Sequence, residues 1–200
     1  MDGCGKTTQL RLLASAFRGQ GRTVVETAEP GGTDIGQQIR RILLDPLNTA
    51  IHPRAELLLY FASRAQNVEQ VIRPALETGA LVLCDRFTDS TLVYQGCGRG
   101  LDSTVVVQLD QIACQGLQPD ITVLIDIDLE TSLARARKRN LRVGQAESRI
   151  DDESAAFHDR VRQGYRALAA REPTRFLVID GRAGIDVVYA RILEALSQRV

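Results

Sequence analysis

The sequence predicts an α/β protein in which helices cover both faces of a parallel β-sheet. Three observations support this prediction. Short runs alternate with longer helical patterns, these runs are continuously apolar or β-branched, and the end of a phosphate-binding loop opens the chain. With 200 residues and 44% apolar composition, the chain is expected to form a single domain over residues 1–200 with an ample core.

The opening stretch MDGCGKTTQL carries the end of a phosphate-binding loop. Gly5, Lys6 and Thr7 match the last part of the pattern G-x-x-x-x-G-K-[ST]. In that pattern backbone N–H groups cradle phosphates, the lysine reaches the terminal phosphates and the hydroxyl ligates Mg²⁺. The first glycine of the pattern would precede Met1, and so would the strand that normally leads into such a loop. The alternative interpretation is a flexible start of the chain.

The remaining elements follow from the spacing of apolar residues. A helix is expected directly after the loop, because Leu10, Leu13 and Phe17 repeat at helical spacing and Gly19 can end the helix. The predicted strands are residues 23–27, 80–84, 121–126 and 176–179. Helical spacing predicts further helices around residues 35–43, 57–76, 105–112, 129–133, 157–168 and 188–196.

Composition limits the possible partners and the compartment. The formal net charge is zero, so the basic field of a nucleic-acid binder is absent and a small acidic substrate fits better. The cysteines are widely spaced, which indicates neither zinc nor a disulfide framework but reduced thiols: Cys4, Cys84, Cys97 and Cys114. No apolar run approaches the roughly 18 residues of a membrane span. A cytoplasmic protein with neither a nucleic-acid nor a membrane partner is therefore predicted.

Two stretches follow predicted strands, where open α/β sheets place their ligand loops. Ala28-Glu29-Pro30-Gly31-Gly32-Thr33 comes after the first strand, and Asp85 and Arg86 come after the second. A carboxylate at this edge can organise Mg²⁺, and an arginine can bind a phosphate in a bidentate way. The alternatives are an ordinary turn for the first stretch and a surface ion pair for the second.

Taken together, these stretches resemble one family closely, the thymidylate kinases. The resemblance extends from residue 2 to at least residue 165 through DGCGKTTQ, EPGGT, YFASRAQ, DRFTDSTLVYQG, PDITVLIDID and SRID. It implies a P-loop enzyme with a five-stranded parallel sheet that transfers the γ-phosphate of ATP to dTMP, giving dTDP. It also implies Mg²⁺ as the cofactor, ATP and dTMP as the small-molecule partners, and a homodimer.

On the ATP side, the resemblance implies a role for each loop residue. The residues implied to bind ATP are Gly3, Cys4, Gly5, Lys6, Thr7 and Thr8. Asp2 resembles the carboxylate that meets the sugar 3′-hydroxyl of dTMP. Thr7 and Asp85 are the implied Mg²⁺ ligands, and Lys6, Asp85 and Arg86 are implied to act in catalysis.

On the dTMP side, Tyr60 resembles the aromatic that stacks on thymine, and Arg64 resembles the donor to the base carbonyl. Because they are four residues apart on a predicted helix, they share one face. The other implied contacts are Arg86 to the dTMP phosphate, Thr91 to the thymine edge, Tyr94 beside the sugar 2′ position, and Glu29 and Gln95. The alternatives are core positions for the tyrosines and a solvated position for Arg64.

An arginine-rich stretch resembles the mobile lid of the bacterial-type enzymes and is placed at about residues 135–150. Its arginines are Arg135, Arg137, Arg139, Arg142 and Arg149. Of these, Arg137 and Arg149 are implied to be catalytic and Arg139 to bind ATP, although the resemblance leaves open which of Arg137, Arg139 and Arg142 acts. Gly3 stands where another branch of the family carries an arginine, so the lid must supply the cation. The alternative is a solvated helix face.

Two departures from the family pattern stand out. Ala28 replaces the usual arginine before Glu-Pro-Gly-Gly, and the leading strand, which is central in the family's sheet, is absent. Because a sheet without its central strand would leave buried backbone groups unpaired, the working protein is expected to be about ten residues longer. A degenerate, non-catalytic paralogue is the alternative if the protein begins at Met1.

The sequence lacks the motifs of two other classes of P-loop protein. A GTP-dependent switch generally carries Asn-Lys-x-Asp, yet Lys6 and Lys138, the lysines of the chain, follow glycine and arginine respectively. The transporter ATPase signature is also absent. The nearest rival is a kinase for another nucleoside monophosphate.

Overall fold

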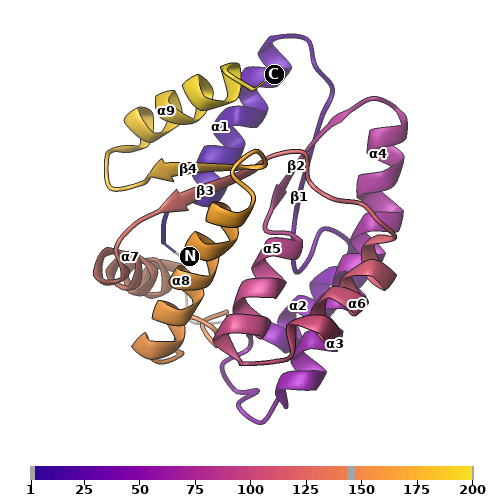
Figure 1. Ribbon diagram of the computed structural model, residues 1–200, viewed down its shortest axis with the longest axis vertical. Helices are drawn as coiled ribbons and strands as arrows, with labels where there is room; N and C mark the ends of the chain where they lie inside the picture. The colour runs from indigo at the N-terminus through magenta and orange to yellow at the C-terminus, as the bar shows by residue number, and fades with distance from the viewer. Residues whose placement is uncertain (1–2, 144–146, 200) are drawn as a thin grey trace.

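The computed structural model describes residues 3–143 and 147–199, without the side chains of residues 139–143. Helices and strands alternate along this chain as predicted (Figure 1). The elements are α1 (Lys6–Gly19), β1 (Val24–Ala28), α2 (Asp34–Leu44), α3 (Pro53–Asn67), η1 (Val68–Ile72), α4 (Arg73–Glu77), β2 (Leu81–Asp85), α5 (Thr88–Thr91), η2 (Leu92–Gly98), α6 (Ser103–Cys114), β3 (Thr122–Asp126), α7 (Leu129–Val143), α8 (Ala155–Arg171), β4 (Phe176–Asp180) and α9 (Ile185–Ser197).

The strands form two parallel pairs. β1 pairs with β2 from Val24 opposite Leu81 to Ala28 opposite Asp85. β3 pairs with β4 from Thr122 opposite Phe176. The predicted positions are confirmed to within one residue at each strand end. In the described part of the chain the pairs remain two separate sheets, with no hydrogen bonds joining one to the other.

The burial predicted for β2 is wrong. Its continuously apolar run predicted a strand covered on both faces, yet all residues from Leu81 to Asp85 are only partly buried. The physical reason is that, of the residues of β2, only Leu83 packs against one of the described core clusters. The other side chains of the strand are therefore covered less completely.

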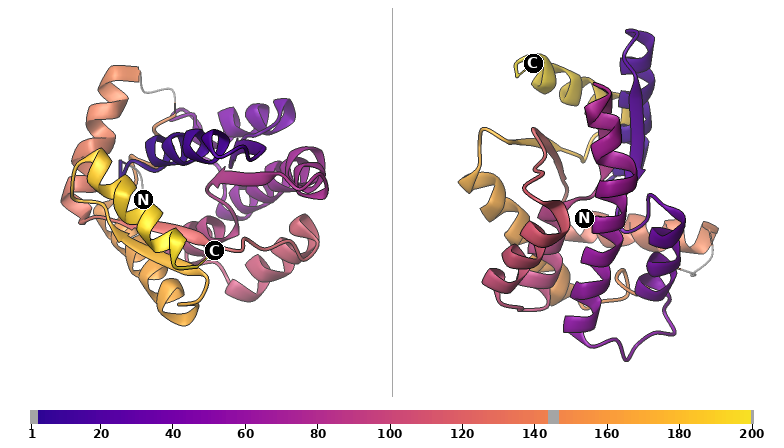
Figure 2. Two further views of the ribbon diagram at one scale, coloured as in Figure 1. Left: turned by 90° about the horizontal axis from the view of Figure 1, so that it is seen from above. Right: turned by 90° about the vertical axis from the view of Figure 1, so that its right-hand side faces the viewer.

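The β3–β4 pair is covered by helices on both faces, as expected for three layers (Figure 2). Because successive strand residues point to opposite faces, Leu124 packs with Phe157 and Val161 of α8 in one cluster. The next residue, Ile125, packs in a second cluster with Leu13 of α1. Helix α9 contributes Ile192 to that second cluster, and Leu83 of β2 packs against it.

Two helical regions differ from the prediction. The helix expected over residues 57–76 begins earlier, at Pro53, where the ring of His52 caps the helix by accepting a hydrogen bond from the N–H of Arg54. It also contains the π-helical turn η1 before α4. A second π-helical segment, η2, follows α5 and was not expected from the sequence. Such turns often occur near functional sites because they displace side chains from the regular helical spacing.

The carboxyl ends of β1 and β2 meet at one edge of their sheet. Ala28 lies opposite Asp85, and the N–H of Glu29 donates to the carbonyl of Asp85 over 3.0 Å. The loop after β1 and the loop after β2 therefore begin together, beside the start of α1, which contacts both strands. This edge is where the sequence predicted the ligand loops.

Candidate active site

The start of α1 offers backbone N–H groups to a ligand. Gly5 is the N-cap with a φ of 90°, a left-handed conformation that favours glycine, and no side chain caps the helix. Thr7 and Thr8 are exposed in the first turn, and no acidic residue occupies that turn. Uncapped N–H groups and the positive end of the helix dipole together favour an anion such as a phosphate.

Gly3 allows the loop to lie against helix α7, which contains the start of the predicted lid. A Cβ added at Gly3 would lie 2.6 Å from the carbonyl oxygen of Ser132 and 2.9 Å from the N of Ala136. The φ of Gly3 is 71°, which also favours glycine. An arginine at this position is therefore incompatible with the observed packing.

Thr7 and Asp85, the predicted Mg²⁺ ligands, contact each other. The hydroxyl of Thr7 donates to Oδ2 of Asp85 over 2.6 Å. The other carboxylate oxygen, Oδ1, is buried and accepts no hydrogen bond from the described residues. Nearby, Lys6 Nζ lies 3.9 Å from the sulfur of Cys4. The phosphate loop and the end of β2 thus form one polar site.

Arg86 has a backbone conformation that is rare for a residue with a side chain, with a φ of 72°. Its Nη2 donates to the hydroxyl of Tyr94 over 3.1 Å, and its guanidinium lies 4.8 Å from the centroid of that ring. Tyr94 is 5% exposed and belongs to the core cluster with Phe157 and Tyr165. Tyr94 therefore occupies the core position that was the alternative and also contacts Arg86, while its place beside the sugar stays a prediction.

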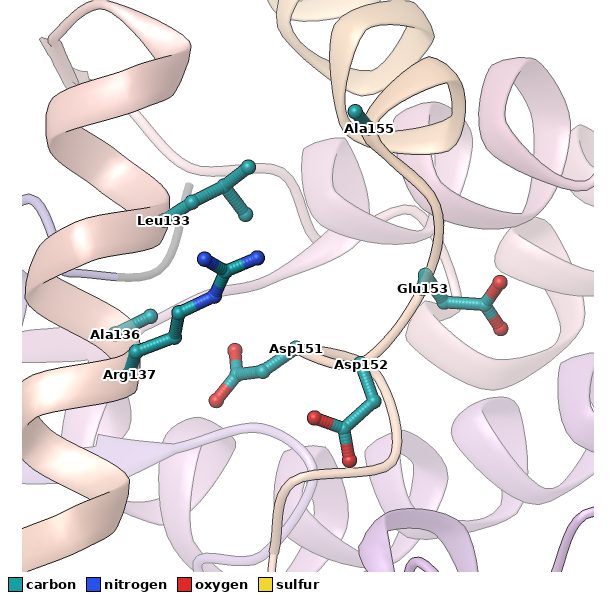
Figure 3. A pocket seen from close by; sticks show the side chains of 7 residues that line it. All are labelled: Leu133, Ala136, Arg137, Asp151, Asp152, Glu153 and Ala155. Atoms are coloured by element: carbon teal, nitrogen blue, oxygen red, sulfur yellow. The ribbon is translucent and has the colours of Figure 1, made fainter.

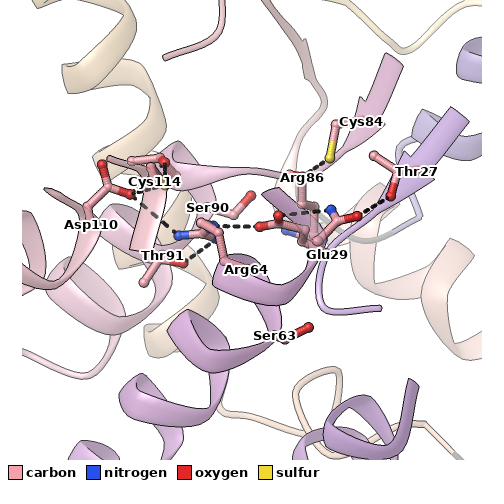
Figure 4. A network of polar contacts seen from close by, with 12 residues as sticks. Thr27, Glu29, Ser63, Arg64, Cys84, Arg86, Ser90, Thr91, Asp110 and Cys114 are labelled. Carbon is pink, nitrogen blue, oxygen red and sulfur yellow. Dashed lines mark hydrogen bonds and ion pairs between the residues drawn. The ribbon is translucent and has the colours of Figure 1, made fainter. Parts of the chain in front are cut away.

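Arg64 is the centre of a buried polar network (Figure 4). Its Nε donates to Oε2 of Glu29 over 2.5 Å, and its Nη2 donates to the hydroxyl of Thr91 over 2.8 Å. Burial acts to lower the pKa of Arg64, but the Glu29 carboxylate raises that pKa overall. The third nitrogen, Nη1, is buried and donates no hydrogen bond to described residues; it lies 3.8 Å from Oδ1 of Asp110.

Helix α3 also holds the loop that follows β1. The hydroxyl of Ser63 accepts from the N–H of Gly31 over 3.1 Å, and Nδ2 of Asn67 donates to Oε1 of Glu29 over 3.1 Å. Both oxygens of Glu29 are therefore engaged within the protein. Its contact to substrate stays a prediction, since the carboxylate accepts from Arg64 and Asn67 in this arrangement.

Gln95 and Arg149 converge on a residue that the sequence did not single out, Glu56. Gln95 donates to its Oε1 over 2.9 Å and Arg149 to its Oε2 over 2.6 Å. Burial would raise the pKa of Glu56, but hydrogen bonds led by that from Arg99 lower it overall. The folded-state pKa of Glu56 therefore lies below the unfolded value of about 4.3. The ionised carboxylate stabilises the fold above a pH of about 4.3, and this stabilisation is lost as the pH falls through the lowered pKa.

The structure describes only part of the predicted lid. Arg135 donates to the carbonyl of Gly181 over 3.3 Å, and Arg137 is exposed. Figure 3 shows the guanidinium of Arg137 in a pocket that also contains Asp151 and Asp152. The other lining residues are Leu133, Ala136, Glu153 and Ala155. Asp2 and the side chains of Arg139 and Arg142 lie outside the described residues.

The structure thus brings most of the predicted residues to one edge, with Tyr60 half-buried on α3 against the core cluster that contains Tyr94. Sequence reasoning missed the supporting residues Glu56, Asn67 and Asp110. A usable signal existed for Glu56, because it lies four residues before Tyr60 and eight before Arg64 on one helical face. No such signal existed for Asp110, which lies on a different helix, α6.

Comparisons with known proteins point to one family. The family model described as Thymidylate kinase matches residues 1–192. Curated proteins named Thymidylate kinase from Trichlorobacter lovleyi and Geobacter sulfurreducens are 49% and 50% identical over 201 residues, covering 100% of this chain and 95% and 94% of theirs. A solved thymidylate kinase structure from Ehrlichia chaffeensis has 33% identity and a TM-score of 0.78, covering 98% of this chain and 94% of that one.

Replacing Arg64 by methionine should destabilise the protein strongly, because it leaves the buried Glu29 carboxylate without its cation. We expect the free energy of unfolding from urea titration to fall by about 3 to 5 kcal/mol. The matched control is Arg182→Met, which removes an ion pair to Asp180 from a side chain that is 70% exposed. The urea midpoint of the control should not move, and an equal loss in both variants would contradict the role of the buried pair.

Proposed function

The chain belongs to the thymidylate kinase family and transfers the γ-phosphate of ATP to dTMP, giving dTDP, and we propose that it does so with the side chains at the carboxyl ends of β1 and β2. This assignment of residues rests on one observation: Asp85 and Arg86 are consecutive residues at the end of β2. Asp85 bonds Thr7 of the phosphate loop, whereas Arg86 contacts Tyr94 across the site. The donor and acceptor sites therefore meet at the end of one strand.

We propose that dTMP lies between α3 and η2. Nη1 of Arg64 is buried and donates no hydrogen bond to described residues, so its N–H groups suit the carbonyl oxygen of a base. A buried donor without a hydrogen bond destabilises the protein until a ligand accepts from it. Thr91, which is 2% exposed, lies next to that guanidinium, and Tyr60 is half-buried on the same helix. Arg86 would then hold the dTMP phosphate, with Tyr94 packed beside the sugar.

Catalysis by these residues requires positioning and positive charge and no covalent intermediate. The transferring phosphoryl group spreads negative charge over its oxygens, which fixed cations and N–H donors stabilise. We assign this role to Lys6, Arg86 and the start of α1, together with Arg137 and Arg149 from the lid. Arg139 is assigned to ATP by its place in that lid.

The residues at the loop fit Mg²⁺. Oδ1 of Asp85 is a buried acceptor without a hydrogen bond from the described residues, and the Thr7 hydroxyl lies beside it. Oxygen donors of this kind are those Mg²⁺ uses in proteins. Bound Mg²⁺ would neutralise phosphate charge, and Thr7 and Asp85 would hold it.

We propose that two copies of the chain associate through α3 and α6. The inner faces of these helices pack against each other through Phe61, Val106 and their neighbours. Their outer faces leave apolar side chains in water, with Leu58 55%, Val105 45% and Ile112 72% exposed. A second copy would cover such side chains.

The compartment that we propose is the cytoplasm. No disulfide joins the cysteines of the described residues, as reducing conditions would keep them: Cys4, Cys84, Cys97 and Cys114. Within the described residues, no helix has the length and apolar character to cross a membrane. Recovery of the native protein from a membrane or secreted fraction would contradict this placement.

Substituting Arg86 by alanine should lower turnover of dTMP by at least about tenfold, which corresponds to a loss of about 1.4 kcal/mol of transition-state stabilisation. The measurement is the steady-state kcat with ATP and dTMP. Arg191→Ala, at an exposed arginine near Asp180, serves as the control and should keep normal turnover. Near-normal turnover of Arg86→Ala would remove Arg86 from the site.

Substituting Asp85 by asparagine should raise the Mg²⁺ concentration that gives half-maximal activity, by about tenfold or more, because a neutral amide attracts a divalent cation less than a carboxylate does. Titration of Mg²⁺ at saturating ATP and dTMP measures this effect. Asp180→Asn is the control for loss of one carboxylate at the end of another strand. An unchanged Mg²⁺ requirement would sink the proposed metal role.

Substituting Ile112 by arginine should convert the dimer to a monomer, since a charge would be buried in an apolar interface. Analytical ultracentrifugation measures the mass of the particle in solution. Leu47→Arg is the control because Leu47 is 86% exposed and lies outside α3 and α6. A wild-type protein that sediments as a monomer would refute the proposed association.

A further inference from the structure

Glu56 is a buried carboxylate at the meeting point of several elements. It lies in the first turn of α3 and is 1% exposed. Arg99 contacts it with two nitrogens, at 3.1 Å to Oε1 and 3.0 Å to Oε2. Gln95 and Arg149 also donate to Glu56, so each of its carboxylate oxygens accepts two hydrogen bonds. A buried charge with this many donors has a fixed orientation.

The contacts of Arg149 fix the segment that leads away from the lid. Its Nη2 donates to Glu56, and its Nε donates to the carbonyl oxygen of Leu43 at the end of α2. Its backbone N–H donates to Leu44 over 3.2 Å. The guanidinium is therefore held at two of its three nitrogens and adopts one orientation.

The two arginines at Glu56 are not equivalent. Arg99 has a second carboxylate partner, because its Nη1 lies 2.5 Å from Oε1 of Glu153. Arg149 contacts Glu56 and is offered no other carboxylate by the described residues. Loss of the Glu56 charge would thus leave Arg99 with a carboxylate partner but Arg149 with none among the described residues.

Glu56 also belongs to the helical face that carries the proposed dTMP contacts. Tyr60 follows it by four residues and Arg64 by eight, so all three lie along one side of α3. Gln95, which Glu56 holds, is adjacent to Tyr94 on η2. One carboxylate therefore links Arg149 to both walls of the proposed dTMP site.

We propose that Glu56 is a positioning residue for phosphoryl transfer, which orients the guanidinium of Arg149 relative to bound dTMP. The proposal rests on the proposed function, because it requires Arg149 to contact the reacting phosphates. Glu56 itself touches no substrate. Its effect on the reaction passes through Arg149, and this separates it from a carboxylate that only stabilises the fold.

The test is a double-mutant cycle on steady-state kinetics, with each variant assayed below its unfolding midpoint. We expect Glu56→Gln and Arg149→Gln each to lower kcat by at least about tenfold while the KM for dTMP changes by less than about threefold. Because Glu56 acts through Arg149, the double variant should be no more than about twofold slower than Arg149→Gln alone.

The matched control is Arg99→Gln, which removes the other arginine from the same carboxylate. It should lower the urea midpoint, as Glu56→Gln does, but keep kcat within about threefold of wild type. If Glu56→Gln does not fold, Glu56→Asp replaces it, because it keeps the charge but withdraws the carboxylate by one methylene.

Three results would overturn the proposal: a kcat of the Glu56 variant within about threefold of wild type, losses that multiply in the double variant, or an equal loss of kcat in Arg99→Gln. A wild-type protein that does not phosphorylate dTMP would instead refute the proposed function. An assay of the wild type with ATP and dTMP therefore distinguishes failure of this proposal from failure of the proposed function.

Discussion

The buried ion pair between Glu29 and Arg64 determines how the loop after β1 is assembled against helix α3 and the α5 turn. Both side chains are 2% exposed, and taking such charges out of water costs several kcal/mol per ion unless geometry and further hydrogen bonds compensate. Asn67 and Thr91 supply those bonds. The loop after β1, helix α3 and the α5 turn are therefore constrained to meet in one arrangement, because any other would leave a buried charge unpaired.

The same constraint acts at Glu56, where the charges come from regions far apart in the sequence. Glu56 and Glu153 balance Arg99 and Arg149, so the cluster is formally neutral although it is largely buried. Two clusters of buried charges on one helix, around Arg64 and around Glu56, attach α3 to the loops on either side of it.

Much of the fold followed from local pattern. Strand positions were predictable to within one residue, because short β-branched runs between helical patterns have few other structures available. The burial of β2 was not predictable in this way, since an apolar run reports what a strand can bury and not which neighbours it has. The expectation of a solvated Arg64, kept as an alternative, is wrong for a related reason: its partner Glu29 lies 35 residues away.

By itself, the sequence determined the family and the reaction through its resemblance, and it located the strand ends at which the predicted ligand loops begin, because motif spacing is local and parallel strands end together. Tertiary structure alone decided the partners of the charges. It paired Arg149 with Glu56 across 93 residues, placed Tyr94 both in the core and against Arg86, and packed Gly3 onto α7. The reason is physical: helical and strand periodicity specify which face a residue occupies, whereas the burial of a charge depends on which distant group arrives to neutralise it.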